Sequence, residues 1–234
     1  MQLAVDLHLH TALSPCSEAE MTPNNIVQMA VLKKLDAIAI TDHNSCDNVA
    51  ACMQVAAGKL LVVPAMELES SEAVHILAYL PDYESLLELG AWVRIGLPQV
   101  KNRPEIFGRQ LVFDCHDEEI AEELMLLANS LNYPLNKVVT KVRSLGGVVV
   151  PAHVNRASYS LLSILGDIPA ELNFTTLEVY GDKNLAVLAQ KYQIITSSDA
   201  HNLAQIMERA EATMLEVEEK STAGILAALV GKIK

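Results

Sequence analysis

Near its start the chain reads Leu3-Ala4-Val5-Asp6-Leu7-His8-Leu9-His10. The run Leu3–Leu7 is apolar except for Asp6, which is typical of a buried parallel strand. Side chains two residues apart on a strand share one face and lie about 7 Å apart along it. His8 and His10 can therefore reach a single metal ion at the end of the strand. Two histidines on a solvent-exposed face would give the same pattern, so this pair alone does not decide between the two interpretations.

Further short apolar segments predict more strands, and helical patterns lie between many of them. Thr22 and Pro23 have the residue types of an N-cap and a first helical position for a helix through Lys34, and Asp117 is predicted to begin another helix. Strands that alternate with helices predict an α/β fold with a parallel sheet. The other predicted strands are Ala37–Thr41, Leu60–Ala65, Val74–Tyr79, Val148–Pro151, Leu177–Tyr180 and Ile194–Thr196.

The length and composition favour one folded domain over residues 1–234. The chain is 51% hydrophobic and 20% charged, which provides enough apolar surface for a core and excludes a disordered protein. No repeat or low-complexity linker divides the sequence. We predict an insertion around residues 81–140. Its first part, Pro81–Gly108, is rich in Pro and Gly and contains a predicted helix at Ser85–Ile95.

The charge balance bears on possible partners. The sequence has 29 acidic and 17 basic residues, a net charge of −12, which disfavours duplex nucleic acid and anionic membranes as partners. The four cysteines form no CxxC pair, and no apolar run reaches membrane-spanning length. We therefore expect a cytoplasmic protein that takes a small substrate. The sequence does not indicate the oligomeric state.

Six of the seven histidines fall at or near the ends of predicted strands, and acidic residues accompany them. Each position has an ordinary explanation: Asp42 and His43 could precede a helix, and His75 could be a hydrogen-bonded core residue. The carboxyl ends of parallel strands share one rim, however, so the set as a whole predicts a polynuclear site for Zn, Mn or Fe. His116, in a polar loop, is expected to be solvated. The residues of the rim are Asp6, His8, His10, Asp42, His43, Glu67, His75, His153, Asp199 and His201.

In chain order these motifs resemble those of the polymerase and histidinol phosphatase (PHP) family. The resemblance implies a distorted (β/α)7 barrel, with two or three divalent metal ions at the carboxyl rim, that hydrolyses phosphate esters. It rests on Asp6-Leu7-His8-Leu9-His10-Thr11, Ile40-Thr41-Asp42-His43, Glu67, His75, Pro151-Ala152-His153 and Ser198-Asp199-Ala200-His201.

The resemblance also implies roles for these residues. Glu67 would bridge two metals, and Asp6 and Asp42 would orient the ligand rings. Glu178 matches another acidic position of the family. The loop Ser14–Glu20 departs from the usual pattern because Pro15 cannot bind a metal, and Cys16, Glu18 and Glu20 are the possible substitutes at the third site. The implied ligands are His8, His10, Glu67 and Asp199 for the first metal, Glu67, His75 and His153 for the second, and His43 and His201 for the third.

The expected reaction is hydrolysis of a phosphate monoester, of a small molecule or a nucleotide, by a metal-activated water. His43, His201 and Asp199 are the expected catalytic residues, with His43 or His201 as proton donor, and Arg156 could bind the phosphate. Three alternatives remain at this stage. The first is a short-oligonucleotide exonuclease of the same family. The second is an amidohydrolase-like barrel, although no Lys ends a strand where such a site needs one. The third is a metal-binding regulatory module without catalysis.

Overall fold

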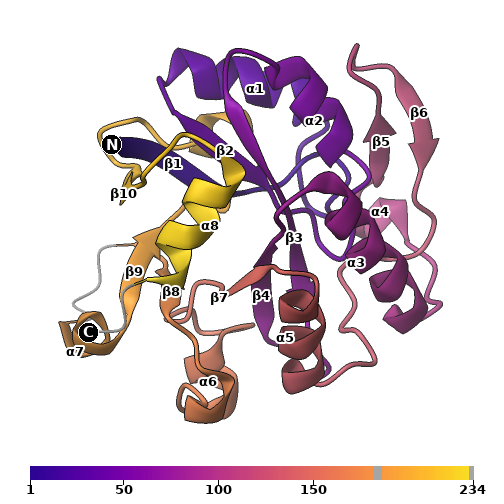
Figure 1. The fold of residues 1–234 in the computed structure, drawn as a ribbon. Helices are drawn as coiled ribbons and strands as arrows, with labels where there is room; N and C mark the ends of the chain where they lie inside the picture. Colours follow the sequence, from indigo (N-terminus) through magenta and orange to yellow (C-terminus); the bar gives the residue numbers. More distant parts are fainter. Residues whose placement is uncertain (182–185, 232–234) are drawn as a thin grey trace.

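The computed structural model describes residues 1–181 and 186–231. Within them the main sheet has six strands in the order β10-β1-β2-β3-β4-β7, and it curls into part of a barrel (Figure 1). This confirms a mixed α/β fold of the predicted kind. The strands are β1 (Gln2–Leu9), β2 (Ala37–Ile40), β3 (Leu61–Glu69), β4 (His75–Tyr79), β7 (Val148–Pro151) and β10 (Thr213–Glu216).

A second, parallel pair of strands, β8 (Thr176–Val179) and β9 (Gln193–Thr196), continues the curve. At one side the backbone amide of Val154 donates to the carbonyl oxygen of Glu178 at 2.9 Å, just after β7 and within β8. At the other side Leu9 and Ala200 form a parallel bridge between the end of β1 and the segment after β9. The ends of β1, β7, β8 and β9 therefore meet around one opening.

The direction of β4 corrects the prediction of a purely parallel sheet. β1, β2 and β3 are parallel to one another, but β4 is antiparallel to both β3 and β7. Only residues 70–74 separate β3 from β4, and so short a connection permits a hairpin but not a parallel crossover. The reversal pairs His75, the first residue of β4, with Glu69, the last residue of β3. His75 thus lies at the same end of the sheet as the carboxyl ends of the parallel strands.

Several helices cover the outer face of the sheet, whereas the last one, α8 (Thr222–Val230), packs against its inner face (Figure 1). The predicted first helix is present, and the Thr22 hydroxyl caps it by accepting from the backbone amide of Asn25. The helix predicted within Ser85–Ile95 is also present, as part of α3. The helices are α1 (Pro23–Leu32), α2 (Val49–Ala56), α3 (Tyr83–Gly96), α4 (Pro104–Phe107), α5 (Leu135–Ser144), α6 (Leu161–Leu165), α7 (Ala186–Lys191) and α8 (Thr222–Val230).

The prediction of a helix that begins at Asp117 is wrong. The structure has an antiparallel hairpin there, made of β5 (Leu111–Phe113) and β6 (Glu119–Glu122). The Asp114 carboxylate accepts from two amides within the turn, and Asp117 has a left-handed backbone with φ of 62°, which no α-helix contains. The Asp117 carboxylate accepts from Thr22 and Asn24, near the start of α1, instead of capping a helix of its own.

Two buried asparagines in the segment after β2, Asn44 and Asn48, form hydrogen bonds with part of the predicted insertion. The Asn48 side-chain amide donates to Thr11 Oγ1 at 2.8 Å and to the carbonyl oxygen of Leu111 at 2.9 Å, and its oxygen accepts from the Phe113 amide at 2.8 Å. Asn44 donates in the same way to two carbonyl oxygens in residues 127–129. The β5–β6 hairpin is thereby fixed beside the opening, while its assignment as an insertion stays a prediction.

We predict that Asn48→Ala lowers the free energy of unfolding by about 2–3 kcal/mol, because it leaves a buried carbonyl and a buried amide without partners. Urea unfolding of the metal-free protein measures the change. Asn136→Ala is the matched control, since Asn136 lies on the exposed face of α5. Equal effects of the two substitutions would contradict the role given to Asn48.

Candidate metal centre

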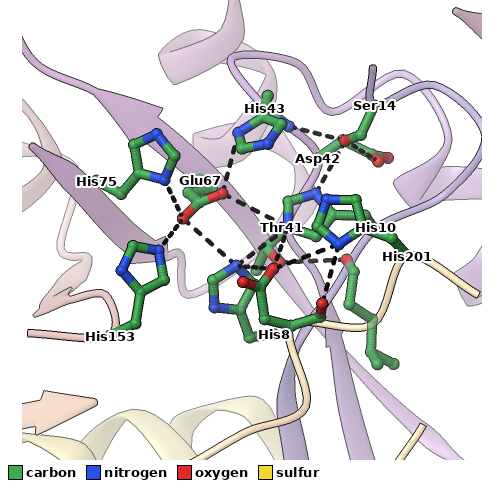
Figure 2. A network of polar contacts seen from close by, with 12 residues as sticks. His8, His10, Ser14, Thr41, Asp42, His43, Glu67, His75, His153 and His201 are labelled. Atoms are coloured by element: carbon green, nitrogen blue, oxygen red, sulfur yellow. Dashed lines mark hydrogen bonds and ion pairs between the residues drawn. The ribbon is translucent and has the colours of Figure 1, made fainter. Parts of the chain in front are cut away.

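Five histidine rings surround the carboxylate of Glu67 at the opening of the curled sheet, and a sixth, His201, lies beside His10 (Figure 2). Glu67 belongs to β3 and is 1% exposed. One carboxylate therefore contacts rings from β1, β4 and the segments after β2 and β7. The distances from Glu67 oxygens are 3.0 Å to Nδ1 of His43, 3.0 Å to Nδ1 of His75, 3.4 Å to Nε2 of His8, 3.5 Å to Nε2 of His10 and 3.5 Å to Nε2 of His153.

The backbone at the opening is strained where ligand candidates occur. His153 has φ of 29° and Asp199 has φ of 51°, values that residues other than glycine rarely adopt. The His153 amide donates to Glu178 Oε2 at 2.9 Å, and this contact helps to hold the conformation. Strain of this kind persists only where surrounding contacts fix it, and it concentrates at functional sites.

Both carboxylate oxygens of Glu67 are buried and have no hydrogen-bond partner, although ring nitrogens lie 3.0 Å away. Burying a carboxylate without hydrogen bonds costs several kcal/mol unless a cation compensates it. Imidazole nitrogens and carboxylate oxygens are ligands that suit Zn, Mn and Fe. The residues at this opening therefore fit a bound divalent cation better than they fit a network of hydrogen bonds.

Other side chains determine which nitrogen the buried rings of His8 and His10 present. His8 Nδ1 lies 3.0 Å and 3.2 Å from the two Glu178 carboxylate oxygens, and His10 Nδ1 lies 2.9 Å from Ser14 Oγ. Ser14 Oγ in turn donates to Asp42 Oδ1 at 2.7 Å. With Nδ1 occupied in this way, both rings direct Nε2 toward the centre, and these two nitrogens are 3.1 Å apart.

The expected placement of Asp6 and Asp42 needs correction. Neither carboxylate contacts the rings of His8, His10 or His43 directly. Asp6 accepts from the backbone amides of Ser198 and Met207, and Asp42 accepts from Thr11 and Ser14. Both aspartates lie one step further from the centre than expected, because Glu178 of β8 and Ser14 of the loop after β1 occupy the ring nitrogens of His8 and His10.

Asp199 lies on the other side of the two rings, with Oδ1 at 3.3 Å from His8 Nε2 and 3.0 Å from His10 Nε2. Its second oxygen, Oδ2, is 2.6 Å from Nη1 of Arg156. The His201 ring stacks on His10 with centroids 4.3 Å apart, and its Nδ1 lies 2.9 Å from the Asp199 carbonyl oxygen. Arg156 and His201 therefore both lie beside Asp199 at the opening.

Three overlapping groups of side chains have ligand atoms close enough to share an ion. The candidates Cys16, Glu18 and Glu20 belong to none of these groups and are exposed, and His116 is likewise exposed. The three residues of this loop that the sequence suggested as metal ligands therefore lie outside the groups that could hold an ion. The groups are His8, His10 and Glu67; His43, Glu67 and His75; and His10, His43 and His201.

In the metal-free protein, protons balance the charges at the centre. Burial alone would lower the pKa of His8 and His75, but the adjacent carboxylates outweigh it: the pKa of His8 lies well above its usual value and that of His75 rises to about 9. Burial alone would raise the pKa of Glu67, yet His75, His8 and His43 hold that pKa well below its usual value. Burial, together with the charge of His201, lowers the pKa of His10 well below its usual value.

Comparison with family models matches residues 6–216 to the PHP domain. Comparison with solved structures finds the lesion-specific endonuclease Q from Pyrococcus furiosus, with a TM-score of 0.72 and 19% identity over 99% of this chain. A candidate metal-dependent phosphoesterase from Bifidobacterium adolescentis has a TM-score of 0.58 and 18% identity over 90% of both chains. At these identities the likeness concerns the fold. Comparison with curated proteins gives no match.

A second endonuclease Q structure contains a 27-mer duplex with an abasic lesion, and it matches this chain with a TM-score of 0.71 and 18% identity over 99% of this chain. This chain spans 56–57% of the two endonuclease Q chains. The expectation that excluded duplex nucleic acid therefore needs correction, because a protein that shares this fold binds a duplex and net charge alone does not exclude it. Within residues 1–181 and 186–231, no helix is long and apolar enough to cross a membrane.

We predict that metal uptake releases protons and that the apparent affinity for zinc falls as the pH falls from about 8 to 6. His8 and His75 are in the charged imidazolium form at neutral pH in the metal-free protein, and a cation must displace one proton from each ring that it binds. Each displaced proton changes the affinity about tenfold per pH unit.

Calorimetric titration in two buffers of different ionisation enthalpy counts the released protons. His116→Ala is the control and should release the same number, since this ring is exposed outside the centre. An affinity that does not vary with pH would contradict the prediction.

Proposed function

Because the chain belongs to the PHP domain family, we propose that it is a metal-dependent hydrolase of phosphate esters. One observation carries the proposal: Glu67 is buried without a hydrogen-bond partner among ring nitrogens 3.0–3.5 Å away. Such a carboxylate is suited to bridging cations. We propose two or three divalent ions, held by His8, His10, His43, Glu67, His75, His153, Asp199 and His201.

When bound, divalent ions supply an acidified water and neutralise the charge of a phosphoryl group. The chain's own residues would hold the ions and orient the ligand rings. Glu178 and Ser14 keep the Nδ1 protons of His8 and His10 away from the centre, so that both Nε2 lone pairs face it. Glu67 and Asp199 supply the negative charge that holds the cations, and the deep burial of Glu67 limits competition from water.

The two proposed proton donors differ in their surroundings. Burial lowers the pKa of His201, and its Nδ1 lies against the carbonyl oxygen of Asp199, so the ring is neutral at neutral pH and retains a lone pair on Nε2. This supports His201 as a metal ligand. Proton donation to the leaving oxygen is then assigned to His43 in the form in which its ring binds no metal, since this ring is partly exposed at the opening.

Arg156 is the proposed phosphate-binding residue. Its guanidinium group pairs with Asp199 at 2.6 Å and lies over the Tyr180 ring, 4.2 Å from the ring centroid. The side chain is 33% exposed, so part of its N–H fork remains accessible from solvent. A planar fork that already faces a carboxylate can also bind a phosphoryl oxygen in two-point fashion.

We propose a small phosphate monoester as the substrate, a proposal supported by the guanidinium group of Arg156 beside the centre. A phosphodiester in DNA is the second candidate, favoured by the match of 99% of this chain to endonuclease Q. Both use the same metal centre. They differ in what must bind beyond the phosphoryl group.

We predict that Glu67→Gln lowers the bound metal content and reduces phosphate release from an aryl phosphate by at least about 100-fold. Metal analysis and a substrate panel assayed with Mn, Zn and Fe measure both quantities. Glu211→Gln, at an exposed position, is the charge-matched control.

Cleavage of an abasic-site duplex without release of phosphate from any monoester would favour the second candidate. Tight metal binding without turnover of any phosphate ester would instead identify a regulatory metal-binding module. An active preparation free of metal would contradict the proposal itself.

For Arg156→Gln we predict a KM for phosphate esters about tenfold higher, with unchanged metal content, because one charge-assisted hydrogen bond to substrate is lost. Arg156→Lys should recover part of this loss, since it restores the charge but not the fork. If both variants lose metal while KM stays constant, Arg156 acts on Asp199 and not on the substrate.

A further inference from the structure

Glu69 contacts the nitrogen of the His75 ring that faces away from Glu67. Neither the sequence motifs nor the proposed function give it a role. It is the last residue of β3, two residues after Glu67, and is 6% exposed. Its Oε2 lies 3.3 Å from Nε2 of His75, and its Oε1 accepts from Ser130 Oγ at 2.5 Å. Both of its carboxylate oxygens thus have defined partners, in contrast to those of Glu67.

The His75 ring lies between two carboxylates. Nδ1 is 3.0 Å from Glu67 Oε1, and Nε2 is 3.3 Å from Glu69 Oε2. When a cation has displaced one of its two ring protons, the imidazole has one N–H and one lone pair, so a ring that donates Nε2–H to Glu69 presents its Nδ1 lone pair toward Glu67. A carboxylate on the far nitrogen of a ligand histidine fixes the tautomer and the ring orientation and strengthens the ligand.

The position of Glu69 is itself fixed from outside the sheet. Its carbonyl oxygen accepts from the Leu131 amide at 2.8 Å, and its own amide donates to Asn44 Oδ1 at 3.3 Å. Ser130 and Leu131 belong to the segment between β6 and α5. That segment therefore reaches the metal centre through one continuous path, from Ser130 through Glu69 and His75 to Glu67.

Tyr159, in the segment between β7 and α6, also contacts the His75 ring. Its ring stacks on His75 with centroids 4.8 Å apart, and its carbonyl oxygen accepts from the His75 amide at 3.0 Å. Stacking restricts the plane of the ring but does not decide which nitrogen carries the proton. Of the two carboxylate contacts of this ring, only that at Nε2 has hydrogen-bond geometry. Glu69 can therefore fix the position of the proton while Tyr159 fixes the plane of the ring.

We propose that Glu69 is a positioning residue that holds the Nε2–H of His75, so that Nδ1 serves as a metal ligand, and that Ser130 holds Glu69 in place. This inference rests on the proposed metal centre. A purely structural ion pair between Glu69 and His75 would affect the stability of the metal-free protein without a matching effect on metal affinity.

The test compares zinc affinity, by competition with a fluorescent chelator, in the wild type, Glu69→Leu, Glu69→Gln, Ser130→Ala and the control Glu211→Gln. We expect Glu69→Leu to weaken binding of the zinc ion that His75 holds by about 10–100-fold. Glu69→Gln, which keeps an acceptor for Nε2–H, and Ser130→Ala should cause smaller losses. Glu211→Gln should match the wild type.

A second readout is the ¹⁵N NMR spectrum of the zinc-loaded protein. The Nε2 proton of His75 should be observed and protected from exchange in the wild type and should exchange rapidly in Glu69→Leu. Thermal unfolding without metal checks the fold, and if Glu69→Leu does not fold, the Gln and Ser130→Ala variants decide the question. Equal zinc affinities with an unchanged His75 signal would overturn the inference alone. A wild type that binds no zinc would overturn the metal centre as well.

Discussion

The rest of the centre depends on one buried carboxylate. The carboxylate of Glu67, on β3, accepts no hydrogen bond, although five imidazole rings approach its oxygens. A negative charge in this position is tolerated only with positive charge beside it, which protons on His8 and His75 provide in the metal-free protein. Divalent cations would do the same and displace those protons, so metal binding and proton release are two aspects of the same constraint.

The sheet makes this arrangement possible by bringing six ligand segments to one edge. Parallel strands alone would not place His75 there, because it is the first residue of its strand. The tight turn after β3 reverses β4, so that its start lies beside the end of β3. The strained backbones of His153 and Asp199 then direct these residues to the opening, and contacts such as that of the His153 amide with Glu178 hold the strain in place.

A set of polar residues surrounds the ligand rings, and among Glu178, Ser14 and Glu69 only Glu178 is far in sequence from its ring. Glu178 holds His8, Ser14 holds His10, and Glu69 contacts His75, each through the ring nitrogen that faces away from the centre. Arg156 provides a positive charge at the opening of a chain with a net charge of −12. This separation of charge is what would allow an acidic protein to attract a phosphate ester.

The sequence by itself determined the ring candidates and most strands, because buried apolar segments ending in His, Asp or Glu are local patterns. These patterns predict His8, His10, His43, Glu67 and His75 at one rim. The hairpin at 111–122 was missed, since Asp117 bonds to residues near α1 that are far away in the chain. Only the tertiary structure decided which carboxylate or hydroxyl lies behind each ring. The pairing of Glu178 with His8 joins residues 170 positions apart, and no local pattern encodes such a contact. Ser14 and Glu69 are near their rings in sequence, but only the path of the loop after β1 and the turn between β3 and β4 bring them into contact.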